Sequence, residues 1–122
     1  MPERIRLSRK KGYRKPEGAI VVARPSKWGN PIRIVPVHRR GPFDLERDGV
    51  GFIGQCTDLD GARASAVRRF RDLVLNHPGL APRVDEIRTE LAGHDLACWC
   101  PLPEPGEPDI CHAAVLLELA NR

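Results

Sequence analysis

Apolar residues repeat at spacings of three and four between residues 58 and 76, and this pattern predicts a helix. Asp58 or Asp60 can cap its first turn. The same periodicity predicts a second helix over residues 82–92 and a third over residues 111–121. The repeating positions of the first helix are Ala62, Ala66, Val67, Phe70, Leu73 and Val74.

Shorter apolar runs predict strands. Residues 19–23 form a continuous apolar run rich in β-branched residues, typical of a buried strand, which we expect at the centre of the sheet. Residues 4–7 alternate between basic and apolar and predict a short edge strand. Residues 95–100 are too short for a helix and also predict a strand. Residues 32–37 favour another strand, and the glycine-rich residues 38–57 are expected to form a long loop.

The order of these elements predicts a compact α/β fold with a small, mainly parallel, Rossmann-like sheet and about three helices. At 122 residues the chain is expected to be a single domain over residues 1–122, with a basic N-terminal arm over residues 1–18. No apolar run approaches the roughly 20 residues that cross a bilayer, and the N-terminus lacks the apolar core of a signal peptide. We therefore expect a cytoplasmic protein.

Positive charge is concentrated at the start of the chain. Residues 1–40 hold twelve Lys or Arg against two acidic residues, whereas residues 41–122 hold eight against fourteen. Clustered cations favour phosphate groups, so the segment indicates a nucleic-acid or nucleotide partner. The alternative is a solvated arm that serves solubility.

The loop after the 19–23 strand is a candidate ligand site, because ligands of α/β sheets bind beyond the carboxyl ends of strands. Arg24 and Lys27 are candidate phosphate ligands, and Trp28 is a candidate for stacking on a ring. Asn30 either forms hydrogen bonds with the polar edge of a ligand or holds the loop through an Asx turn. Alternatively, Trp28 anchors the core and residues 29–31 are only a turn.

Cys98, Cys100, Cys111 and His112 lie within fifteen positions of one another. Period-two geometry places Cys98 and Cys100 on one face of a strand, roughly 6 to 7 Å apart. Cys111 and His112 begin the last predicted helix, where the helix dipole stabilises a thiolate. Cys56 is remote from this cluster and is expected to be a small buried residue.

Three interpretations of this cluster are open. A zinc site would use all four side chains, although adjacent residues at a helix start point in different directions and make this geometry demanding. A reactive site would use an ionised Cys100 or Cys111, with His112 as a base or orienting group. Lastly, the thiols would simply fill space beneath Trp99. Disulfides are disfavoured because we expect a reducing compartment.

Three stretches together resemble a known family: residues 24–31, reading Arg-Pro-Ser-Lys-Trp-Gly-Asn-Pro, residues 96–101, reading Leu-Ala-Cys-Trp-Cys-Pro, and residues 111–121, beginning Cys-His-Ala-Ala. They look like the domain of unknown function 4326, found in bacteria and their phages, and with the basic lead-in the resemblance covers nearly the whole chain. The family carries no settled activity. The resemblance implies that the Cys/His motifs and the 27–31 loop are its recognisable features; here residues 41–56 look like an insertion.

These observations support one leading hypothesis and two alternatives. The leading one is a small nucleotide- or nucleic-acid-binding domain with a zinc-type Cys/His site. The first alternative is an enzyme acting on a nucleotide or nucleoside, a transferase or hydrolase of the glycosidic bond. The second is a structural zinc module for protein contacts.

Overall fold

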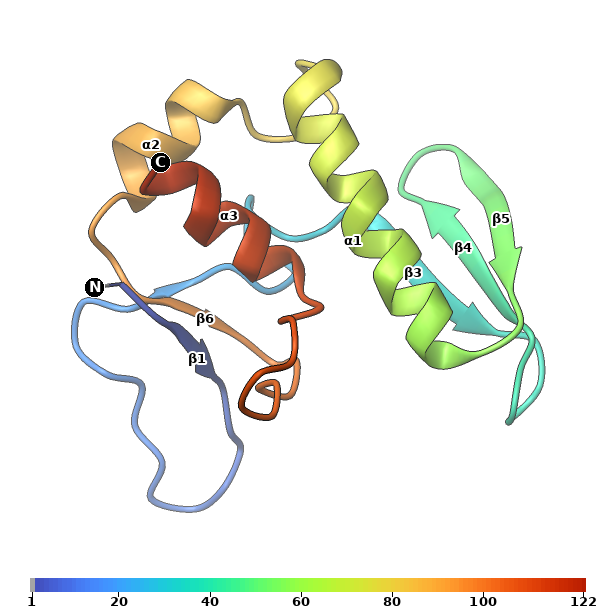
Figure 1. Cartoon of the computed structure of the whole chain (residues 1–122), viewed down its shortest axis with the longest axis horizontal. Helices are drawn as coiled ribbons and strands as arrows, with labels where there is room; N and C mark the ends of the chain where they lie inside the picture. Colours follow the sequence, from blue (N-terminus) through green and yellow to red (C-terminus); the bar gives the residue numbers. More distant parts are fainter. Residues whose placement is uncertain (1) are drawn as a thin grey trace.

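The computed structural model describes residues 2–122 and shows a small α/β domain with three helices and two sheets (Figure 1). Met1, the first residue of the predicted basic arm, lies outside the described residues. The strands are β1 (Arg4–Arg6), β2 (Ile20–Val21), β3 (Ile32–Pro36), β4 (Phe43–Arg47), β5 (Gly51–Cys56) and β6 (Leu96–Cys98). The helices are α1 (Leu59–Asn76), α2 (Val84–Leu91) and α3 (His112–Ala120).

The first sheet is parallel, with the order β1-β6-β2. All three residues of β6 are buried, as expected of a strand covered on both faces. The prediction that residues 19–23 form the central strand is wrong, because β2 is an edge strand and β6 takes the centre. β1 is an edge strand, as predicted, and leads into the long loop of residues 7–19, which projects from the domain (Figure 1).

The second sheet is an antiparallel meander in the order β3-β4-β5. The prediction of a long loop over residues 38–57 is wrong, since β4 and β5 lie within it. Gly49 lies in the turn between β4 and β5, and Gly51 begins β5; both have a positive φ, of 81° and 95°, which favours glycine. The glycines of this tight turn therefore led to the prediction of a loop in place of two strands. Because of this sheet, the fold is not purely Rossmann-like.

Helix α1 joins the two sheets. It runs between the meander and the half of the molecule that holds β1, β6, α2 and α3 (Figure 1). Phe70 and Val74 enter the core beneath the parallel sheet, whereas Ala62, Ala66 and Leu73 enter a second core against the meander. The predicted cap is confirmed, since Asp58 accepts a hydrogen bond from the Gly61 amide at 2.6 Å.

All three helices lie close to their predicted positions. α2 is shorter than the predicted 82–92, and α3 starts one residue after the predicted start, with Cys111 as its N-cap. None of the helices formed by residues 2–122 has the length and apolar character of a membrane-spanning segment.

Candidate metal centre

The three thiols meet where β6 ends and α3 begins. Cys98 is the last residue of β6, Cys100 lies two positions further on, and Cys111 caps α3. The Cys98 and Cys100 Sγ atoms are 3.9 Å apart, and the three Sγ atoms all lie within 4.8 Å of one another. Tetrahedral zinc with Zn–S bonds of about 2.3 Å separates its sulfur ligands by about 3.8 Å. The cluster therefore fits a metal ion of that size.

His112 lies beside this set, buried to 7% exposure. Its Nε2 is 2.7 Å from the Val22 carbonyl oxygen, and because a carbonyl can only accept, Nε2 must carry the proton. In the neutral ring, Nδ1 is then unprotonated, and it lies 3.9 Å from the Cys111 Sγ. A metal-bound histidine commonly donates its other N–H to such a backbone carbonyl. Phe70 packs edge-on against the ring, at 5.4 Å between centroids.

The three thiols shift one another's pKa values. Hydrogen bonds with the Cys100 and Cys111 thiols lower the pKa of Cys98. The pKa of Cys111 is raised by its hydrogen bonds to Cys100 and Cys98 and by burial. A metal ion bound by the three sulfur atoms would displace the thiol protons.

Arg4 fixes the chain around the cluster. Its side chain is only 3% exposed and forms an ion pair with Asp109. The guanidinium also donates to the carbonyl oxygens of Cys100, at 2.9 Å, and Pro101, at 2.6 Å. Arg4 thus ties together both ends of the proline-rich loop between Cys100 and Cys111. The alternating pattern of β1 did not distinguish the buried Arg4 from the exposed Arg6. The difference arises because the loop between Cys100 and Cys111 folds back over Arg4.

A cavity of about 450 Å³ opens beside the cluster. The three cysteines and His112 line one side of it, together with Trp99. Apolar side chains from β3 and α1, including Ile32 and Val67, line much of the rest. Three arginines complete the lining: Arg24, Arg33 and Arg63.

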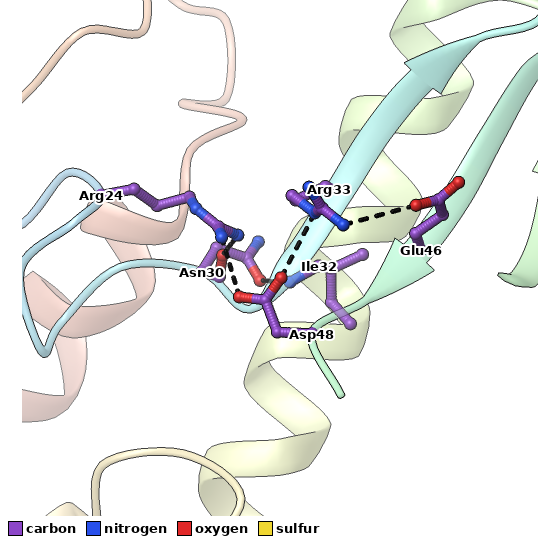
Figure 2. A network of polar contacts seen from close by, with 6 residues as sticks. All are labelled: Arg24, Asn30, Ile32, Arg33, Glu46 and Asp48. Carbon is purple, nitrogen blue, oxygen red and sulfur yellow. Dashed lines mark hydrogen bonds and ion pairs between the residues drawn. The ribbon is translucent and has the colours of Figure 1, made fainter. Parts of the chain in front are cut away.

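Two of these arginines share one carboxylate (Figure 2). Asp48 accepts from Arg24 at 2.8 Å and pairs with Arg33 at 3.2 Å, while Arg33 also reaches Glu46 at 3.4 Å. Arg24 donates in addition to the Asn30 carbonyl oxygen, at 2.9 Å. These pairs are largely exposed, so they orient the guanidinium groups more than they stabilise the fold.

The predicted loop residues separate into two groups. Arg24 and Asn30 line the cavity, which also borders the thiols and the start of α3. The Asn30 side chain holds the loop, since it accepts from the Ile32 amide at 2.9 Å and donates to the Ala66 carbonyl at 3.2 Å. These bonds match the loop-holding role considered for Asn30.

Lys27 and Trp28 lie away from the cavity. Lys27 pairs with Glu90 of α2 at 2.8 Å and lies over the Trp28 ring, 4.6 Å from its centroid. Trp28 is 4% exposed and packs in the core, so the structure places it as the core anchor that was the alternative to stacking. Cys56 is half-buried against the second core, apart from the thiol cluster.

The sequence did not single out three charged or aromatic residues of the cavity: Arg33, Arg63 and Trp99. Arg33 lies in the meander, whose full extent was not predicted, and Arg63 lies on a helix that was predicted only from its apolar positions. Trp99 was considered only as a side chain that covers the thiols. Its place between two cysteines at the end of a buried strand was the available signal.

The fold and the site together define a small two-sheet α/β domain with a three-cysteine cluster able to bind a metal ion. The sequence profile of the domain of unknown function DUF4326 matches residues 5–122, and the chain belongs to that family. Comparisons with curated proteins and with solved structures yield no match.

Proposed function

We infer that this chain is a small nucleotide- or nucleic-acid-binding domain whose Cys/His centre holds zinc. The observation that carries the inference is the position of the three thiols, which lie within 4.8 Å of one another on the wall of a cavity that three arginines also line.

The donor set favours zinc among common metals. Thiolate ligands suit zinc and other soft metals, whereas magnesium and calcium prefer oxygen. Cys98, Cys100 and Cys111 would supply three ligands and the Nδ1 of His112 the fourth, held in the correct tautomer by the Val22 carbonyl. Three thiolates on Zn²⁺ leave one net negative charge, and the buried Arg4 guanidinium nearby would compensate it.

The charges around the cavity support an anionic ligand. Arg24 and Arg33 face it in orientations held by Asp48, and Arg63 adds a third cation from α1. Phosphate groups match such guanidinium groups in geometry and charge. The basic loop of residues 7–19 would add attraction at longer range, which salt screens.

Elemental analysis tests the metal centre. Protein purified without added metal should contain about one zinc per chain, and Cys98→Ser should lose it. Cys56→Ser is the matched control, because Cys56 lies outside the cluster, and it should retain the metal. Folded wild-type protein without metal, with all four thiols open to titration, would contradict the zinc centre.

One observation favours an enzyme as a second candidate. The Nδ1 of His112 lies 3.9 Å from Cys111 but does not belong to the mutually close set of three thiols. If a metal engaged only the thiols, its fourth position would stay open toward the cavity, as in catalytic zinc sites. His112→Asn would then keep zinc but change turnover of a nucleotide or nucleoside, whereas loss of zinc in this variant would mark His112 as a ligand.

A further inference from the structure

Trp99 is an exposed aromatic residue at the end of a buried strand. Its side chain is 44% exposed, although β6 directly before it is buried throughout. The ring lines the cavity beside the thiols and also a second hollow, formed with Arg6, Leu7, Ser8 and Arg9. The Arg9 guanidinium lies 5.0 Å from the ring centroid. Trp99 therefore connects the cavity to the basic N-terminal loop.

Arg63 carries the charge that the protein leaves available to a ligand. Arg24 and Arg33 are both engaged by Asp48, whereas no ion pair within residues 2–122 involves Arg63. Arg63 also borders a smaller hollow, but Asp60, Glu107 and Asp109 line that hollow and would repel an anion. An anion is therefore favoured on the side of Arg63 that faces the cavity.

From these observations we propose that the cavity takes one nucleotide unit, with its base stacked on Trp99 and its phosphate bound by Arg63. The proposal rests on the proposed function and deepens it by naming the ligand unit and the residues that contact it. Trp99 replaces Trp28 as the stacking residue, because the Trp28 ring is buried in the core.

The chemistry of the lining supports a ligand with a flat ring and an anionic group. A base stacks on an aromatic side chain regardless of its sequence identity, and an apolar wall such as Ile32, Ile34 and Ile110 accommodates the ring edge. The volume of about 450 Å³ lies within the range of small-ligand pockets. An inorganic anion alone would leave the apolar wall and Trp99 without contacts.

The nucleotide unit can be free or part of a single strand, and the position of Trp99 makes the two sources distinguishable. In a strand, the phosphate on the far side of the stacked base would approach Arg6 and Arg9 in the second hollow. A free mononucleotide would not reach them. Neutralising Arg6 therefore weakens binding of a strand and leaves binding of a mononucleotide nearly unchanged.

The experiment measures quenching of tryptophan fluorescence in the zinc-loaded full chain, titrated with adenosine monophosphate, with ribose 5-phosphate and with a short single-stranded oligonucleotide. Trp99→Ala should weaken nucleotide binding about tenfold or more, and Trp99→Phe should retain most of the affinity. Binding to these two variants is measured by calorimetry, because the substitution removes the fluorescent side chain. Arg63→Gln should weaken binding about tenfold. Arg68→Gln, on the same helix but outside the cavity, is the matched control and should bind as the wild type does.

Binding of ribose 5-phosphate as tight as that of the nucleotide, or unchanged binding by Trp99→Ala, would overturn the proposal. A zinc-loaded protein that binds neither nucleotide probe would also overturn the proposal. The metal centre would not be affected by that result, because it is tested separately by elemental analysis. Absence of zinc together with binding that depends on Trp99 would have the opposite meaning, refuting the metal centre and keeping the nucleotide site.

Discussion

The two walls of the cavity are built on different principles. The thiol wall comes from β6 and the start of α3, where Cys98, Cys111 and His112 are buried and held by core packing and backbone hydrogen bonds. The arginine wall comes from the meander, α1 and the loop before β3, and its arginines are exposed; Asp48 holds the guanidinium groups of Arg24 and Arg33 (Figure 2). Buried donors in fixed positions suit a metal, whereas exposed charges suit a ligand that comes and goes.

This difference predicts that substitutions on the two walls will affect different properties of the protein. Changes at the thiol wall should alter metal content and stability together, because a metal ion held by buried side chains would stabilise the fold. Changes to the charged side chains of the arginine wall should alter ligand binding with little effect on stability, because exposed ion pairs contribute at most about 1 kcal/mol.

The largest effect is expected from Cys111→Ser. It removes a buried thiol of the proposed zinc centre, at the N-cap of α3, so zinc affinity should fall by well over the roughly 100-fold typical of outer-shell partners. The melting temperature should also fall, measured by calorimetry on metal-loaded protein. Cys56→Ser, outside the cluster, should change neither quantity appreciably. Equal melting temperatures for Cys111→Ser and the wild type would show that the thiol cluster does not contribute to the stability of the fold.

Arg4→Ala should produce the next largest effect. It leaves the partly buried Asp109 carboxylate and two carbonyl oxygens without their partner, which should destabilise the fold by about 3 kcal/mol. Zinc affinity should fall about 10- to 100-fold as the loop after Cys100 loosens. Urea unfolding and chelator competition measure the two quantities. Arg6→Ala, exposed on the same strand, is the control, and an equal loss of stability in both variants would refute the positioning role of Arg4.

Gly29→Ala tests how closely the arginine wall is packed. A Cβ atom at this position would lie 2.8 Å from the Arg24 Cγ and 3.1 Å from its Cα, so Arg24 or its backbone must shift. We expect a loss of about 1 to 3 kcal/mol in unfolding free energy, weaker nucleotide binding and unchanged zinc content. Loss of zinc in this variant would show that the two walls are not independent.

The smallest effect is expected from Asp48→Asn. It removes the shared partner of Arg24 and Arg33, yet these pairs are exposed, so stability should change by less than about 1 kcal/mol and the change should shrink at high salt. Urea unfolding at two salt concentrations measures this. A loss as large as that of Arg4→Ala would mean that the arginine wall, like the thiol wall, is built into the core.

How much of this could be predicted from sequence differs between the walls. The meeting of Cys98 and Cys100 with Cys111 follows from local rules, since a strand repeats every two residues and a helix start exposes its cap. The arginine wall depends on strand pairing: Arg33 and Asp48 meet only because β3, which was predicted, pairs with β4, which lies in what was predicted to be a loop. Likewise, the burial of Trp28 and the exposure of Trp99 are decided by tertiary packing, which single-residue chemistry does not reveal.

X-ray absorption at the zinc edge, on protein purified without added metal, tests the metal centre most directly. The structure leads us to expect about three sulfur ligands at about 2.3 Å and one nitrogen at about 2.0 Å, from the three cysteines and His112. A protein that is folded without zinc, or zinc surrounded only by oxygen and nitrogen, would contradict this account.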